Sequence, residues 1–180
     1  MMIAHLSDSQ LLAGVIDVTT TEVADELMGG VFSAGPGRLD AIARSRVPYV
    51  GSCGALDMVN FGAIETLPEK YKGRLVHVHN ANVTLMRTTP EENTRMGAFI
   101  AAKLNAMDGP VRFLMPLGGV SSLDAPGQAF WWPEADQALF AAIERDFRAA
   151  PDRKLVKRPE NLNDPAFAQA LVDAWAEIAR

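Results

Sequence analysis

Short apolar runs alternate along the chain with longer stretches in which apolar residues recur every three or four positions. The short runs predict buried strands at 14–18, 47–51, 75–79 and 111–117. A more charged run at 154–157 predicts a fifth strand, at an edge of the sheet. Strands that alternate with helices favour parallel pairing through right-handed crossovers.

The longer stretches predict helices at 36–46, from 89–90 to about 109, at 133–147 and at 163–178. Thr89-Pro90-Glu91-Glu92 is typical of a helix start, with Thr as N-cap, Pro at the first helical position and acids in the first turn. We therefore expect a three-layer, Rossmann-like open α/β sheet, mostly parallel, with about five strands and helices on both faces.

The beginning of the chain departs from this pattern. Residues 3–12 resemble the tail of an amphipathic helix, and no strand precedes them, whereas an open α/β domain normally starts with a strand. We expect a single α/β domain over 1–180 that lacks its first βα unit, as a fragment or a truncated gene product.

Composition narrows the class of protein. The 180 residues are 48% hydrophobic and 22% charged, as in ordinary globular domains. A net charge of −5 argues against nucleic-acid binding, which needs a basic face. No apolar run approaches the roughly 18 residues that span a bilayer, and no signal peptide is recognisable, so we expect a cytoplasmic protein without membrane contact. One Cys and three His give neither a disulfide framework nor a zinc pattern, and we expect no metal.

Candidate chemistry follows the expected strands, because open α/β sheets bind ligands beyond the carboxyl ends of their strands. After the first strand, Thr19, Thr20, Thr21 and Glu22 precede a helix and suit an anion, although plain N-capping is an equal alternative. After the second strand, the candidate ligand contacts are Ser52, Gly54, Asp57 and Asn60. Cys53 is a conceivable nucleophile, but a buried inert thiol is the favoured interpretation.

The third and fourth strands are followed by further polar groups. Arg87 suits a carboxylate or phosphate, and His79 suits acid–base chemistry, with Asn80 and Thr88 beside them. The alternative is a structural ion pair and a satisfied histidine. After the fourth strand come Gly118 and Gly119 as backbone donors, Ser121 as a hydroxyl and Asp124 as a carboxylate. The apolar segment 130–133 is expected to line the pocket, cover it or pack on a partner.

Several of these segments together carry a family resemblance. They are GVIDVTTTEVADEL at 14–27, GALDMVNFG at 54–62, TLMRTTPEEN at 84–93, DAPG at 124–127 and PEAD at 133–136. In them the chain resembles the C-terminal half of the Tm-1-like, UPF0261 family. The resemblance implies two Rossmann-like domains around a cleft. It also implies ATP binding mainly through an N-terminal domain that this chain lacks, and no settled enzymatic activity.

Three hypotheses result. The favoured one is a domain that binds a small phosphorylated or carboxylated ligand as half of an ATP-associated cleft. The second is a hydrolase or transferase in which Asp57, His79, Arg87 and Asp124 lie within one substrate's span. The third is an interaction module that forms homo-oligomers through the loop around Trp131 and Trp132 and through the expected N-terminal helix.

Overall fold

A parallel sheet forms the centre of the computed structural model, which describes residues 12–179. Its described strands are β1 (Val15–Thr19), β2 (Tyr49–Gly54), β6 (Val111–Pro116) and β7 (Arg153–Arg158), in the order β1-β2-β6-β7. Every neighbouring pair is parallel. Lys154 and Lys157 lie on the edge strand β7, as their charges predicted.

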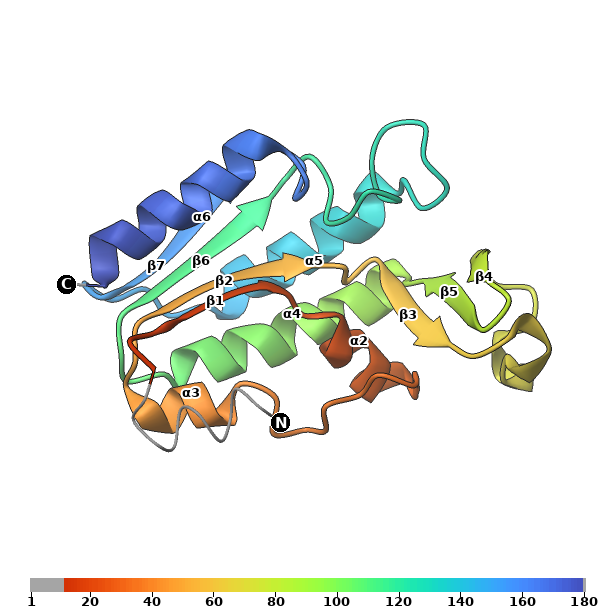
Figure 1. Ribbon diagram of the computed structural model, residues 1–180, viewed down its shortest axis with the longest axis horizontal. Coiled ribbons are helices and arrows are strands. Elements are labelled where there is room, and N and C mark those ends of the chain that lie inside the picture. The colour runs from red at the N-terminus through yellow and green to blue at the C-terminus, as the bar shows by residue number, and fades with distance from the viewer. Residues whose placement is uncertain (1–11, 180) are drawn as a thin grey trace.

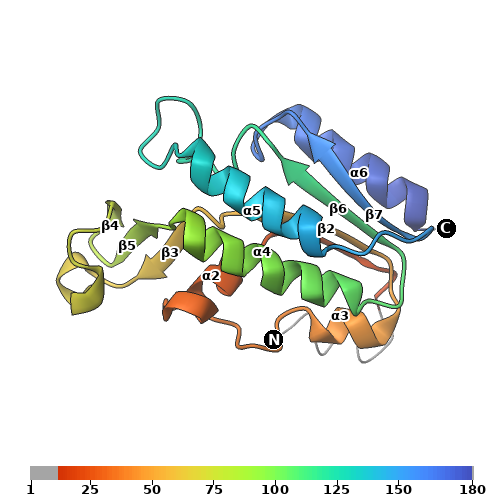
Figure 2. The same cartoon turned by 180° about the vertical axis from the view of Figure 1, so that it is seen from behind.

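Helices cover both faces of this sheet (Figures 1 and 2). The helices α4 (Pro90–Asn105) and α5 (Pro133–Asp146) lie side by side on one face, and α6 (Pro165–Ile178) lies on the other. The helices α2 (Thr21–Met28) and α3 (Asp40–Ser45) flank α4. The three-layer open α/β architecture expected from the sequence is therefore confirmed.

The apolar periodicity of the helices explains this packing. Met96, Ile100 and Leu104 of α4 and Leu139 and Ile143 of α5 are fully buried against the sheet. On the opposite face, a smaller cluster joins α6 to β2 and β6. The predicted start of α4 is confirmed as a complete capping box between Thr89 and Glu92.

A second, antiparallel sheet was not expected. It consists of β3 (Met58–Phe61), β4 (Val76–Asn80) and β5 (Val83–Arg87), in the order β3-β5-β4. The short helices η1 (Ile64–Thr66) and η2 (Glu69–Tyr71) connect β3 to β4. The sheet lies beyond the carboxyl ends of the parallel strands (Figure 1).

The second sheet corrects one prediction. The strand expected at 75–79 exists, but it pairs antiparallel with β5 instead of joining the parallel sheet. Neither of its faces is well buried, because β4 is an edge strand. The reason is local: residues 81–82 form a tight turn, so β5 returns directly along β4 without the helix that a parallel crossover needs.

Boundaries differ in smaller ways. The helix expected at 36–46 begins only at Asp40, after a turn, and the helix expected to reach 109 ends at Asn105. The segment expected to be helical at 3–12 lies outside the described residues except for Leu12. Over residues 12–179, no helix has both the length and the apolar character that crossing a membrane requires.

Candidate functional site

Three of the four residues proposed as catalytic meet in one buried place. Arg87 ends β5, Asp57 lies in the turn between β2 and β3, and Asp124 lies in the loop between β6 and α5. All three side chains are essentially inaccessible to solvent. Ser121 and Asp136 complete this group, which we call the buried acid cluster.

Arg87 is the hub of the cluster. Its guanidinium donates to Asp136 Oδ1 at 2.7 Å and to Asp124 Oδ1 at 3.3 Å. It also donates to the carbonyl oxygens of Phe130 at 2.8 Å and Trp132 at 3.4 Å. One side chain thus ties the antiparallel sheet to the middle and the C-terminal end of the 117–132 loop and to α5. Arg87 is a structural ion-pair centre, the alternative that the sequence left open.

Asp57 has an unusual environment for a carboxyl group. Its Oδ2 accepts a 2.7 Å hydrogen bond from Ser121 Oγ. Ser121 Oγ in turn accepts from the backbone N–H groups of Leu123 and Asp124. Among the described residues, Asp57 Oδ1 has no hydrogen-bond partner although it is buried. Burial raises the pKa of Asp57 to about 7, the charge of Asp124 adds to the rise, and the Ser121 hydrogen bond and the charge of Arg87 oppose it.

Asp136 was missed as a site residue by the sequence argument, which included it only in the PEAD segment at 133–136. The structure buries it against Arg87. Burial raises the pKa of Asp136 to about 7, and the neighbouring charge of Asp124 acts in the same direction against the lowering effect of Arg87. Residue type and position gave no signal for this role, because exposed acids are common at helix starts.

The loop after β6 is fixed from a second side by Asn161, which sequence reasoning also missed. Its Nδ2 donates to the carbonyl oxygens of Gly118, Ser121 and Asp124, each at 3.1 Å. The backbone N–H of Gly118 donates to Glu160, and that of Gly119 donates to Pro116. The backbone donors that the two glycines were expected to offer a ligand are therefore used internally.

Gly119 has a packing role that explains its residue type. Its φ is 118°, and a Cβ there would overlap the carbonyl oxygen of Asp124. Gly54 also permits a close approach, since a Cβ would lie 2.5 Å from the carbonyl oxygen of Val18 and 2.7 Å from Leu162. Both glycines close the strand ends instead of opening them to a ligand.

The threonine run after β1 is arranged differently. Thr20 is buried and donates to the Ser52 carbonyl at 3.4 Å, and Thr21 Oγ1 accepts from Asn60 Nδ2 at 3.0 Å. Within the described chain, no side chain caps the N-terminus of α2, so plain N-capping by Thr20 is wrong. Thr19 is exposed at the end of β1.

Charged groups flank the same helix start. Glu22 lies half-buried in the first turn of α2, with Oε2 3.7 Å from Arg38 Nε. Arg38 Nη2 also contacts Asp17 Oδ1 at 2.8 Å. The Arg38 guanidinium thus partly balances the Glu22 carboxylate beside the open end of α2.

Other predicted contacts are interior. The Ser52 side chain is fully buried, and Thr88 Oγ1 donates to the Leu56 carbonyl and accepts from Asn93. Burial raises the pKa of the Cys53 thiol well above its usual range, which supports the inert interpretation.

His79 and Asn80 lie apart from the buried acid cluster. Both are exposed on β4, and Asn80 Oδ1 accepts from Asn82 N in the following turn. The other histidine of β4, His77, lies nearer to the cluster. Its ring is 6.3 Å from the ring of Phe130, whose carbonyl oxygen accepts a hydrogen bond from Arg87. The four-residue catalytic centre is therefore not assembled in this structure. Across residues 12–179, no group of three His, Cys, Asp or Glu side chains has the arrangement of a metal site.

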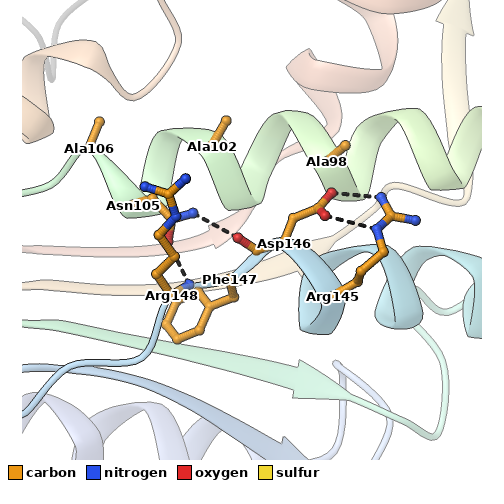
Figure 3. A pocket seen from close by; sticks show the side chains of 8 residues that line it. All are labelled: Ala98, Ala102, Asn105, Ala106, Arg145, Asp146, Phe147 and Arg148. Carbon is orange, nitrogen blue, oxygen red and sulfur yellow. Dashed lines mark hydrogen bonds and ion pairs between the residues drawn. The ribbon is translucent and has the colours of Figure 1, made fainter.

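A cavity of about 650 Å³ has none of these residues in its lining. Figure 3 shows the side chains that do line it. It sits at the carboxyl ends of α4 and α5, where Ala98, Ala102 and Ala106 form one wall. Asn105 donates to the Asp146 carbonyl and accepts from Arg148 N across it. The cavity does not contain any candidate residue from the sequence.

The fold and the internally bonded strand-end loops define an open-sheet α/β domain of the Rossmann-like class. The chain belongs to the uncharacterised protein family UPF0261, whose C-terminal domain model matches residues 1–179.

Relatives of known name agree with this assignment. A UPF0261 protein of Rhizobium meliloti is 56% identical over 97% of this chain, which corresponds to 44% of that protein. The ToMV resistance protein Tm-1(GCR237) of Solanum lycopersicum is 45% identical over 93% of this chain and 22% of its own length. A UPF0261 protein of Clostridium tetani is 47% identical over 91% of the chain. The chain thus spans less than half the length of these curated relatives.

Proposed function

We propose that this domain binds a small phosphorylated or carboxylated ligand at the carboxyl edge of its parallel sheet, as one wall of a two-domain cleft. The observation that carries the proposal is the start of α2. In the part of the chain that the structure describes, this helix begins at Thr21 without a side-chain cap, two residues after the exposed Thr19. Uncapped backbone N–H groups at a helix start favour an anion.

Backbone hydrogen bonds join the segments around this helix start. Thr20 N donates to the Gly54 carbonyl, and Ala55 N donates to the Val120 carbonyl, so the ends of β1, β2 and β6 are bonded to one another. The buried acid cluster and Asn161 hold the next loop. A ligand would meet a preorganised surface, which lowers the entropic cost of binding.

The second wall of the cleft would come from the part of the relatives that this chain does not span. ATP is a candidate ligand for the complete cleft because the family resemblance suggests it. An isolated domain is expected to bind the same phosphate group more weakly, since half of the contacts are missing.

The enzyme hypothesis receives less support. Asp57, Arg87 and Asp124 converge, but each is buried and bonded to protein groups, so a substrate has no path to them in this conformation. The interaction hypothesis loses part of its surface, because Phe130 is fully buried and packs inside the domain. Trp131 retains 37% of its exposure.

Calorimetric titration with ATP, with and without Mg²⁺, inorganic phosphate and citrate tests the proposal. Both this chain and the full-length Rhizobium meliloti relative should be titrated. Thr19→Glu, which places a carboxylate at the helix start, should weaken binding at least about tenfold. Gln137→Glu, on the exposed face of α5, adds the same charge elsewhere and should leave binding unchanged. Absence of binding heat for every compound in both proteins would refute the proposal.

A further inference from the structure

The buried acid cluster gathers more negative groups than it has positive ones. Asp57, Asp124 and Asp136 surround the single guanidinium of Arg87. If all three carboxyl groups were ionised, the cluster would carry a net charge of −2 out of contact with water. A low-dielectric interior strongly disfavours such a charge, so carboxyl groups in this position retain protons.

The hydrogen bonds of the three carboxyl groups differ. Asp124 accepts at both oxygens, from Arg87 at Oδ1 and from the backbone N–H of Val120 at Oδ2, at 2.9 Å. In the described structure Asp57 has one oxygen without a partner. One ionised carboxyl group beside Arg87 and two protonated ones give a cluster without net charge.

We propose that the buried acid cluster is a proton-operated latch, which holds the 117–132 loop closed while Asp57 and Asp136 are protonated and releases it when they ionise. Among the segments that contact the cluster, the loop is the longest one without helix or strand. Its contacts with the cluster are the Ser121 hydroxyl, Asp124 and the carbonyl groups of Phe130 and Trp132.

The shape of the loop supports this assignment. It makes a wide excursion between β6 and α5 (Figure 1), and residues 126–129 are exposed. The other members of the cluster lie on elements with regular hydrogen bonding or in the short turn that joins β2 to β3. Admitting water to the ionised cluster therefore costs least where the loop lifts.

The titratable neighbours of the buried acid cluster, among the residues that the structure describes, lie on β2, on and just before β4, and in the first turn of α4. The neighbouring titratable groups are Cys53 on β2, His77 on β4, Arg74 and Glu92. Cys53 stays a neutral thiol because burial raises its pKa. Arg74 is paired with Glu92 at 2.8 Å and reaches only the carbonyl group of Arg87. From α4 the nearest contact is the neutral amide of Asn93, which donates to Thr88.

Native-state hydrogen exchange of the full chain between pH 6 and pH 8 tests the latch. Protection factors, corrected for intrinsic exchange, should fall about tenfold or more in residues 117–132 as the pH rises, while those of α4 stay constant. Asp136→Asn mimics the protonated side chain and should remove most of the pH dependence. Asp173→Asn, an exposed change on α6, should behave as the wild type.

A measurement on the unaltered chain covers the case in which Asp136→Asn does not fold. Carboxyl ¹³C NMR titration should show the ionisation of Asp57 and Asp136 with the same midpoint as the loss of loop protection. Protection of 117–132 that does not change with pH, or that falls equally in folded Asp136→Asn, would overturn the proposal. This test does not involve the ligand, so its outcome is independent of the proposed function.

Discussion

Replacement of Gly97 by Ala sets helix propensity against packing in the layer formed by α4 and α5. Gly97 is buried in the middle of α4, facing α5. A Cβ there would lie 2.7 Å from Ala142 Cβ and 2.7 Å from the Leu139 carbonyl oxygen. Alanine is the better helix former by about 1 kcal/mol, so propensity alone predicts a stabilised protein.

The packing term should exceed this gain. Ordinary contacts of a Cβ begin near 3.4 Å, so α4 and α5 would have to separate locally by about 0.7 Å. The Leu139 carbonyl belongs to the backbone of α5 and cannot turn away. Overpacking of this kind costs about 1–3 kcal/mol, and we expect a net loss of about 1–2 kcal/mol after the propensity gain.

Urea unfolding followed by circular dichroism and by tryptophan fluorescence measures this difference. The control is Ala102→Gly on the exposed side of the same helix, which should lose about 1 kcal/mol through propensity alone. The reasoning fails if Gly97→Ala unfolds at the same urea concentration as the wild type or at a higher one.

Four further predictions concern the strand-end network. Burial raises the pKa of Asp57 to about 7, so the folded chain holds this proton more tightly than the unfolded chain. The free energy of unfolding should therefore fall as the pH rises from about 4 to about 7. Asp57→Asn should reduce this dependence of the free energy of unfolding on pH, and in urea titrations at pH 8 it should stabilise the chain by on the order of 2–4 kcal/mol. Arg87→Met should cost about 3–5 kcal/mol in the same assay, because it leaves buried carboxyl groups without their cation; an unchanged midpoint would contradict the hub role. Asn161→Ala removes the three hydrogen bonds to the loop and the two that Asn163 donates to Asn161 Oδ1. It should lower the free energy of unfolding by about 2–4 kcal/mol, whereas a loss below about 0.5 kcal/mol would mean that they contribute little. Cys53 should react with a thiol reagent at pH 8 only in unfolding concentrations of urea, and fast reaction of the native chain would show that it is accessible.

Apolar periodicity predicted the main layers of the domain because each main element buries a face of its own. The helices α4, α5 and α6 begin close to the predicted positions, marked by Pro90, Pro133 and Pro165. The same method assigned 75–79 to the wrong sheet. A run of alternating Val and His has the same pattern in a parallel sheet as in an antiparallel hairpin, and only the tertiary partner distinguishes them.

The sequence predicted several of the residues that meet at the candidate site, but not the structural role that they have there. The enzyme hypothesis expected Asp57, His79, Arg87 and Asp124 to converge. Asp57, Arg87 and Asp124 do meet, together with Ser121, but as partners of one another, and His79 lies apart. A polar group can bind a ligand only if it is not already hydrogen-bonded within the protein. The distances that decide this cannot be read from the sequence. The role of Asn161 depends on β7 bringing residues 159–161 beside the loop after β6, which only the assembled sheet provides.

The position of the antiparallel sheet along the chain has a consequence for how the domain folds. The central pair β2 and β6 joins residues about sixty positions apart, and the whole antiparallel sheet and α4 lie in the chain between them. Closing so long a segment lowers the chain entropy before the pairing of β2 with β6 can stabilise the fold. The β4–β5 hairpin is local in sequence, so we expect it to form early and to shorten the effective loop that β2 and β6 must close. Destabilising the turn at 81–82 should then slow folding more than it speeds unfolding.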